Sequence, residues 1–219
     1  MKTFVVIPAF NEEERIEETI KETLKYCENI IVVDDGSNDK TFEKALSKGV
    51  SVIRLCQNEG KSEAMKVGIK KAISFEATHI IFLDADGQHS PKIIPLLEQA
   101  IKTLSCDLIF TSRKINKQAM PLRKRLGNWF LTKMINLLHG AKITDSQCGL
   151  KIIDIKCYYD IKWDCKGYLV ESAIAINSEK EKLKYAEIPI ETVYLDENKG
   201  TNIMTGFKIM KYVIMRCWK

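Results

Sequence analysis

The sequence predicts an α/β fold in which a mostly parallel sheet is covered by helices on both faces. Short β-branched apolar runs alternate with helical segments through the N-terminal half, and the connections between them are short. Repeated strand–helix–strand units with short connections build a parallel sheet of this kind. Five strands are expected in this half, at Thr3–Pro8, Asn29–Val33, Val50–Leu55, His79–Leu83 and Asp107–Thr111.

Helices are expected between these strands. In the first of them, Ile16, Ile20 and Leu24 recur every four residues and form one apolar stripe. Asn11, with Glu14 three residues later, is a variant of the capping box, so Asn11 is either the helix cap or a ligand contact. The further helices expected in this half are Asp39–Lys48, Ser62–Ser74 and Lys92–Thr103.

Three more elements are expected in the C-terminal part. A helix over Leu122–His139 carries Leu126, Phe130 and Met134 at helical spacing, and part of this stripe is expected in the core. A strand is expected over Ala186–Val193. The tail, residues 203–219, places Ile203, Phe207, Met210 and Ile214 on one face and lysines elsewhere. Such a basic amphipathic helix either lies on an anionic bilayer or packs against the sheet.

The composition is that of an ordinary soluble α/β domain. The chain has 219 residues, of which 45% are hydrophobic and 29% charged, and its net charge of +5 is too mild to indicate nucleic acid but suits phosphates or an anionic membrane face. The seven cysteines are scattered and include no Cys-x-x-Cys, so neither a zinc site nor a disulfide framework is indicated, and a reducing cytoplasm is expected. No apolar run approaches the roughly 18 residues of a spanning helix, so the chain is not expected to cross a membrane.

The fourth strand ends on a pair of carboxylates. The apolar run from Ile80 to Leu83 leads directly into Asp84-Ala85-Asp86, and Gln88 follows two residues later. In extended backbone, side chains two residues apart point the same way, so Asp84 and Asp86 are expected to face one site. Because two such acids repel each other, a hard divalent cation bound through oxygen, Mg²⁺ or Mn²⁺, is expected between them. The alternative is a pair of solvated acids in a turn.

Two other strand ends favour the first interpretation. The first strand runs into Pro8-Ala9-Phe10-Asn11-Glu12, and the second ends at Asp34-Asp35-Gly36-Ser37. In open parallel sheets, ligands bind beyond the carboxyl ends of the strands, where these segments are expected to meet. Gly60-Lys61, before the third helix, could offer a cation to a phosphate, although a solvated loop lysine is the expected alternative.

Four motifs resemble, in their order, the inverting family 2 glycosyltransferases of the GT-A fold. They are Pro8-Ala9-Phe10-Asn11-Glu12, Asp34-Asp35-Gly36-Ser37, Asp84-Ala85-Asp86-Gly87-Gln88 and Asp145-Ser146-Gln147-Cys148-Gly149-Leu150. More narrowly, they resemble the branch that makes polyprenyl-phosphate sugars, such as dolichol-phosphate mannose synthase and dolichyl-phosphate β-glucosyltransferase. The resemblance covers about the first three quarters of the chain. It implies a Rossmann-like nucleotide-diphospho-sugar transferase fold, with residues 1–202 as one catalytic domain, residues 1–112 as its nucleotide-sugar-binding half, residues 113–202 as its acceptor half, and residues 203–219 as the C-terminal helix.

The resemblance also implies where the donor lies. The residues expected to line the nucleotide are Pro8, Ala9, Asn11 and Glu12. Asp35 is expected to bind the base or ribose and Asp84 to lie near the ribose or diphosphate, while Asp86 and Gln88 are expected to hold the metal. When the bond between the sugar and the nucleoside diphosphate breaks, negative charge develops on the departing phosphate, and a cation held by carboxylates neutralises it.

For the acceptor, the resemblance implies an arginine after the fifth strand and another at the start of the next helix. Arg113 and Arg125 are the best matches, with Arg123 as the alternative register. An arginine side chain matches phosphate oxygens in pairs. Asp145 is expected at the reaction centre, where it would orient the acceptor or accept a residual proton, and Glu171 is expected to face the site. A phosphate acceptor is already largely ionised at neutral pH, so the enzyme needs alignment more than a strong base.

The expected reaction is therefore metal-dependent transfer of one sugar, with inversion, from a nucleotide sugar to a polyprenyl phosphate on the cytoplasmic face of the membrane. The chain is expected to act as a peripheral enzyme or to depend on a membrane partner subunit. Relatives carry a Gly-Ser-Lys loop over the diphosphate where this chain has residues 198–202, so Lys199 substitutes or the lid is weakened. The alternatives are a saccharide hydroxyl as acceptor, a silent nucleotide-sugar binding module, and a nucleotidyltransferase, which the absence of glycine from residues 8–15 disfavours.

Overall fold

The computed structural model describes residues 1–113, 122–192 and 203–218, and within them seven strands form one sheet in the order β3-β2-β1-β4-β6-β5-β7. All neighbouring pairs are parallel except those of β6, which is antiparallel to β4 and to β5. The strands are β1 (Thr3–Ala9), β2 (Ile30–Asp34), β3 (Ser51–Arg54), β4 (His79–Phe82), β5 (Leu108–Arg113), β6 (Lys151–Asp154) and β7 (Tyr185–Ile190).

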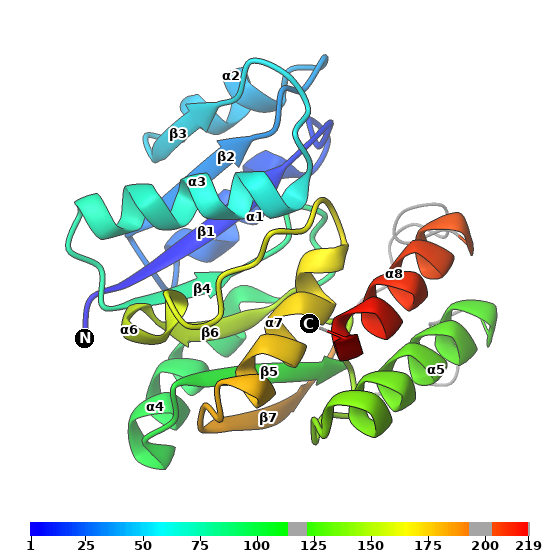
Figure 1. The fold of residues 1–219 in the computed structure, drawn as a ribbon. Coiled ribbons are helices and arrows are strands. Elements are labelled where there is room, and N and C mark those ends of the chain that lie inside the picture. The colour runs from blue at the N-terminus through cyan, green and yellow to red at the C-terminus, as the bar shows by residue number, and fades with distance from the viewer. Residues whose placement is uncertain (114–121, 193–202, 219) are drawn as a thin grey trace.

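Helices cover both faces of the sheet, and two of them extend beyond its edge (Figure 1). One core cluster lies between the sheet and α3 and α7, with α5 and α8 joined to its side; the other lies between the opposite face and α1 and α4. The helices are α1 (Ile16–Leu24), α2 (Thr41–Leu46), α3 (Lys61–Ser74), α4 (Ile94–Leu104), α5 (Leu122–His139), α6 (Ile155–Tyr158), α7 (Leu169–Lys180) and α8 (Ile203–Met215), with 3₁₀ turns η1 (Pro91–Ile93) and η2 (Arg216–Trp218).

The predicted fold class is confirmed, and the strands expected from the sequence are all present with ends shifted by one or two residues, or by three at the end of β7. We did not predict β6, α6 or α7. In α7 every residue from Val170 to Ser178 is buried, so its sequence has no polar face and no helical period. The four residues of β6 begin with Lys151, a residue type that is almost never fully buried without a partner.

The predicted capping role of Asn11 is wrong. Helix α1 begins at Ile16, and Asn11 lies earlier, with a positive φ of 53°. Its backbone N–H donates to Ser37 Oγ at 2.9 Å, and its side-chain Oδ1 accepts from the Asn38 N–H at 3.0 Å. Asparagine tolerates this left-handed conformation better than most residues. Asn11 therefore joins the loop after β1 to the loop after β2 at the edge of the sheet.

The apolar stripes predicted on α5 and α8 are only partly in the core, as expected for α5; for α8 the sequence left packing and bilayer contact open. On α5 the buried residues are Leu131, Thr132 and Ile135, whereas Trp129 remains 58% exposed. On α8, Ile209 and Val213 are buried. The predicted stripe residues Leu126, Phe130, Phe207 and Ile214 are exposed. Each helix therefore has one apolar side packed against the protein and a second apolar side at the surface.

Helix α3 packs closely on β1 and β2 because it has glycine at position 68. A Cβ at Gly68 would lie 2.3 Å from Val6 Cγ1 and 3.4 Å from Val33 Cγ2. Both valines are buried in the sheet and β-branched, so they have little freedom to move aside. The close contact brings the first turn of α3, with Lys61, over the sheet edge.

We expect Gly68→Ala to lower the free energy of unfolding. Overpacking costs about 1 to 3 kcal/mol and outweighs the helix propensity of roughly 1 kcal/mol that alanine adds. Thermal unfolding would show a lower midpoint, by a few degrees per kcal/mol for a chain of this size. Gly127→Ala is the control, since a Cβ there meets nothing within 4 Å and the same propensity gain should stabilise the protein. An unchanged midpoint for Gly68→Ala would contradict the close packing.

Candidate active site

A cavity of about 890 Å³ opens at the carboxyl ends of the parallel strands. Its floor comes from the residues that follow β1, β2 and β4, and its opposite side comes from the end of β5 and from α5 and α8. The site residues predicted from the sequence that line it are Pro8, Ala9, Glu12, Asp35, Asp84, Asp86, Gln88, Arg113, Arg123 and Glu171. The structure therefore brings most of the predicted residues to one place.

Asp84 is fixed at the cavity floor from two sides. Lys61 Nζ lies 2.6 Å from its Oδ1, and a Cβ on Gly149 would lie 2.1 Å from its Oδ2. The loop between α5 and β6 can thus pass against the carboxylate only because position 149 has no side chain. Burial raises the pKa of Asp84, but the Lys61 charge outweighs burial, so the pKa of this carboxyl lies below its ordinary value.

Asp86 has the opposite electrostatic environment. Burial, and next the charge of Asp84, raises its pKa to about 6. Among the described residues, the hydrogen bond to its carboxylate comes from the Gln88 backbone N–H, at 3.0 Å. The two acids predicted to share a site therefore do repel each other, and Lys61 compensates mainly Asp84.

The expectation that Lys61 is a solvated loop lysine is wrong. Its side chain is only 14% exposed, and its Nζ lies between Asp84 and Glu171, 2.9 Å from Glu171 Oε1. The charges of these two acids outweigh burial and raise the pKa of Lys61 above its ordinary value. Lys61 is therefore a permanent cation in the wall of the cavity.

Asp35 holds the loop that leads into α3. Its two carboxylate oxygens accept from the backbone N–H groups of Glu59 and Gly60, at 2.8 and 2.9 Å. Burial outweighs these bonds, so the pKa of Asp35 lies above its ordinary value. Asp35 lines the cavity, whereas the neighbouring Asn11 does not.

On the opposite side, Arg113 and Asp145 form a two-pronged ion pair. Arg113 Nε lies 2.6 Å from Asp145 Oδ2, and Arg113 Nη2 donates to Oδ1 at 2.9 Å. The Asn128 amide on α5 donates to the same Oδ1 at 2.9 Å. Although burial raises the pKa of Asp145, the charge and hydrogen bonds of Arg113 outweigh it, so Asp145 stays ionised. Arg113 lines the cavity, and Asp145 lies behind it.

The first turn of α5 adds more positive charge. Arg123 and Lys124 line the cavity, whereas Arg125, the register that we preferred from the sequence, does not. Lys199 lies outside the described residues. The cavity wall also includes residues that we did not assign to the site from the sequence, among them His89, Asn128, Tyr168, Phe207 and Met210. His89 directly follows the acid motif, and this position was a signal that could have been used.

The donor set at the floor suits a hard cation that is shared with a ligand. Within residues 1–113, 122–192 and 203–218, no cluster of three or more Asp, Glu, His or Cys side chains could hold a metal alone. Asp84, Asp86 and Gln88 supply oxygens from one segment that faces the cavity. Mg²⁺ is commonly bound by one or two carboxylates, with water and substrate phosphates completing the shell, and these residues fit that pattern.

None of the helices in the described parts of the chain is long and apolar enough to span a bilayer.

The sequence matches the family described as "Glycosyl transferase family 2" over residues 4–160, from β1 to just beyond α6. Together with the fold and the cavity, this match defines a glycosyltransferase of the GT-A type. More particularly, this chain belongs to Glycosyl transferase family 2, as its four motifs predicted.

Two relatives and one solved structure illustrate the similarity. The chain is 34% identical to a UDP-N-acetylglucosamine–dolichyl-phosphate N-acetylglucosaminyltransferase of Methanococcus voltae, over 97% of this chain and 94% of that protein. It is 36% identical to a dolichol-phosphate mannosyltransferase of Pyrococcus furiosus, over 71% of this chain and 44% of that protein. The fold is shared by glucosyl-3-phosphoglycerate synthase from Mycobacterium tuberculosis, which was solved with Mn²⁺, UDP and phosphoglyceric acid. The TM-score is 0.75 and the sequence identity 18%, over 99% of this chain and 78% of that one.

We expect Gly149→Ala to lower glycosyl transfer by about 100-fold, because a displacement of the order of 1 Å at a reacting site has effects of this size. The new Cβ would force the Asp84 carboxylate away from its present position. Steady-state rates and thermal midpoints should be measured together. Gly206→Ala is the matched control, since Gly206 lines the same cavity and a Cβ there meets nothing within 4 Å. Equal rates for the two variants would contradict the assigned role of the Gly149 contact.

Proposed function

We propose that this chain transfers a sugar, with inversion and with the help of Mg²⁺ or Mn²⁺, from a nucleotide diphosphate sugar to a polyprenyl phosphate at the cytoplasmic face of the membrane. The observation that carries the proposal is the division of one cavity into two charged sides. Carboxylates of Asp84 and Asp86 lie at the floor, and the cations Arg113, Arg123 and Lys124 lie across from them. Such a cavity suits two anionic substrates that must react with each other.

The floor is assigned to the donor. Pro8 and Ala9 end β1, and Glu12 follows it; all three line the cavity, as Asp35 does, and by analogy with the family we place the nucleoside there. Asp86 and Gln88, with Asp84, would hold the metal. A bound divalent cation would neutralise the charge that develops on the departing diphosphate. Lys61 adds a fixed positive charge to the same wall, which lowers the cost of bringing a diphosphate close to carboxylates.

The cationic side is assigned to the acceptor phosphate. Guanidinium groups bind phosphate oxygens in pairs, and the Asp145 carboxylate holds that of Arg113 in one orientation. Because Asp145 accepts hydrogen bonds from Arg113 and Asn128, we assign it the orienting role and not that of a proton acceptor. The acceptor phosphate is largely ionised at neutral pH and needs no strong base. The protein would then act by aligning the two anions for in-line attack.

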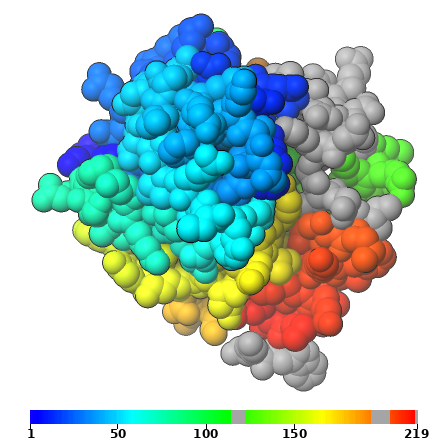
Figure 2. All heavy atoms as spheres, turned by 90° about the horizontal axis from the view of Figure 1, so that it is seen from above, coloured from blue at the N-terminus to red at the C-terminus, as the bar shows by residue number. Residues whose placement is uncertain are grey.

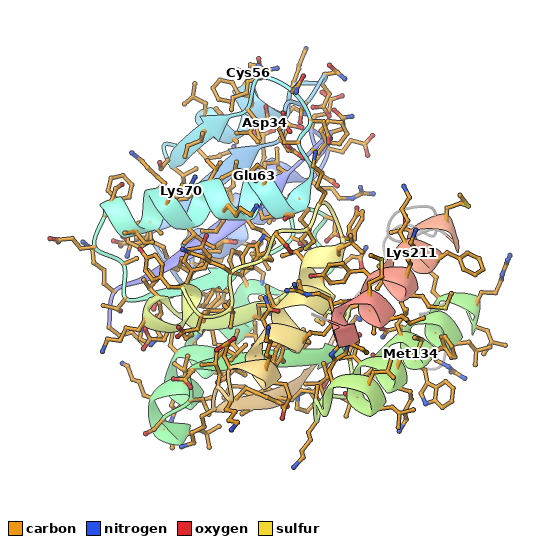
Figure 3. All side chains as sticks on the ribbon, in the orientation of Figure 1. Asp34, Cys56, Glu63, Lys70, Met134 and Lys211 are labelled. Carbon is orange, nitrogen blue, oxygen red and sulfur yellow. The ribbon has the colours of Figure 1, made fainter. Side chains whose placement is uncertain are left out.

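The apolar surface of α5 and α8 supports a lipid acceptor. Figure 2 shows α8 at the surface at one side of the molecule, and in Figure 3 Met134 and Lys211 mark α5 and α8 side by side. Phe130, Phe207 and Met210 line the cavity and continue onto this surface. The large apolar residues exposed on the two helices are Leu122, Leu126, Trp129, Phe130, Leu137, Leu138, Met204, Phe207, Ile214 and Met215.

The charge of this surface matches an anionic bilayer. Neither α5 nor α8 contains an acidic residue, while Arg123, Lys124, Arg125 and Lys133 lie on α5 and Lys208 and Lys211 on α8. Exposed apolar patches of this kind mark interaction sites, and a basic rim favours anionic lipid headgroups. We therefore assign the surface to peripheral membrane contact beside the mouth of the cavity. A saccharide acceptor would give no reason for so much apolar surface there.

The test of the proposal is an acceptor comparison. The protein, with Mn²⁺ and a panel of UDP and GDP sugars, should transfer sugar to a short-chain polyprenyl phosphate and not to the matching polyprenol or to free oligosaccharides. Transfer to oligosaccharides in preference to the lipid phosphate would overturn the acceptor assignment. Measurement of the product anomer against the donor anomer checks inversion.

Arg123→Ala and Arg125→Ala form a matched pair for the acceptor side. Arg123 lines the cavity and Arg125 does not, so only the first substitution should remove a phosphate contact. Hydrogen bonds to charged groups are worth about 1.5 to 3 kcal/mol, which corresponds to a loss of roughly 10- to 100-fold in kcat/KM for the acceptor. Donor affinity should be unchanged in both variants. If only Arg125→Ala lowers kcat/KM for the acceptor, Arg125 binds the acceptor phosphate, as expected from the sequence, and Arg123 does not.

Asp86→Ala should abolish metal-dependent turnover, with a loss of at least about 100-fold, because the charge on the leaving diphosphate would lack its cation. Calorimetric titration of Mn²⁺ in the presence of UDP or GDP should show the same loss of binding. Asp160→Ala is the control, since Asp160 is exposed and outside the cavity. If Asp86→Ala turns over nearly as fast as the unmodified protein, Asp86 is not a metal ligand.

A further inference from the structure

Four charged side chains of alternating sign run from the core of the protein to the cavity. Lys151 Nζ contacts Glu171 Oε2, Glu171 Oε1 lies 2.9 Å from Lys61 Nζ, and Lys61 Nζ lies 2.6 Å from Asp84 Oδ1. These residues come from β6, α7, the start of α3 and the segment after β4. Only tertiary packing brings them together.

The inner end of this chain is deeply buried. Lys151 is 1% exposed and Glu171 is 3% exposed. A buried charge without a partner is very unfavourable, whereas the two cations and two anions here balance one another. Lys151 does not line the cavity, so it is not placed to touch a substrate.

Lys151 also holds the backbone that presses on Asp84. Its ammonium group donates to the carbonyl oxygens of Cys148 and Gly149, at 3.0 and 3.2 Å, in addition to its contact with Glu171. An ammonium group has three donors, so all three are used. Gly149 in turn lies against Asp84 Oδ2. Lys151 thus acts on both oxygens of Asp84, on Oδ1 through Glu171 and Lys61 and on Oδ2 through Gly149.

We propose that Lys151 is a positioning residue which, through Glu171 and Lys61, fixes the Asp84 carboxylate for the donor diphosphate and its cation. The identity of the ligand rests on the proposed function, while the chain of contacts does not. If the Lys151 charge is removed, Lys61 is the one cation that remains in ion-pair contact with Glu171 among the residues that the structure describes. Lys61 is then drawn toward the buried Glu171, and Asp84 loses both its cation and its fixed position.

The experiment is a double-mutant cycle of Lys151→Met and Glu171→Gln. Methionine and glutamine keep the approximate size of the side chains and remove their charges. Each single variant unbalances the chain, and we expect each to weaken the binding of UDP or GDP with Mn²⁺ by about 10- to 100-fold, as is usual when a supporting partner of a metal site is lost. The double variant leaves the neutral pair Lys61–Asp84, and most of the affinity should return. Calorimetry gives the affinities, and thermal unfolding reports the fold of each variant.

A purely structural role makes a different prediction. In that case the two substitutions damage packing independently, their effects add, and the double variant binds more weakly than either single variant. If Lys151→Met does not fold, the comparison of Glu171→Gln with the double variant is sufficient. The positioning role then requires that Glu171→Gln binds the nucleotide and Mn²⁺ more weakly than the double variant does. Steady-state kinetics should show the single defects in the donor KM and in kcat, with the acceptor KM unchanged.

The outcomes separate this inference from the proposed function. If the unmodified protein binds neither UDP nor GDP with Mn²⁺, the proposed donor is wrong. If it binds one of them and the double variant shows no recovery over the single variants, only the positioning role of Lys151 is overturned. The acceptor does not enter the binding measurement, so an error in its assignment leaves the test intact.

Discussion

The ammonium group of Lys61 makes the acidic edge of the sheet possible. Asp84, Asp86 and Glu171 all face one cavity, where burial strengthens the repulsion between carboxylates. Lys61 lies within ion-pair distance of Asp84 and of Glu171 and compensates both. Because Lys61 begins α3 and Glu171 lies on α7, the same contacts also join two helices that cover one face of the sheet.

A second ion pair organises the opposite side of the cavity. Asp145 holds the guanidinium group of Arg113, and the Asn128 amide ties α5 to the same carboxylate. The first turn of α5, with Arg123 and Lys124, is thereby placed across from the acids. In the proposed reaction, these cations reduce the repulsion between two anionic substrates, and the apolar outer sides of α5 and α8 accept the lipid chain.

The predictable parts of the structure were those with a local signal. β-branched runs located the strands, and the parallel order of the sheet then placed Asp35, Asp84 and Asp86 at one edge, because parallel strands end on the same side. Helix α7 gave no such signal, since burial on all sides removes the polar face on which the helical period depends. The stripes of α5 and α8 had the right period, but the period did not reveal which apolar side faces the core.

Sequence alone determined the fold class, the family and the set of strand ends that form the site, because hydrophobic period and short motifs are properties of neighbouring residues. Tertiary structure decided which charges meet. Lys61 and Lys151 have ordinary local surroundings in the sequence, and only the packing of β6, α3 and α7 shows that both are held by Glu171. The choice of Arg123 over Arg125 as the cavity residue was likewise set by the rotation of α5 against the sheet edge, since residues two apart on a helix point about 200° apart.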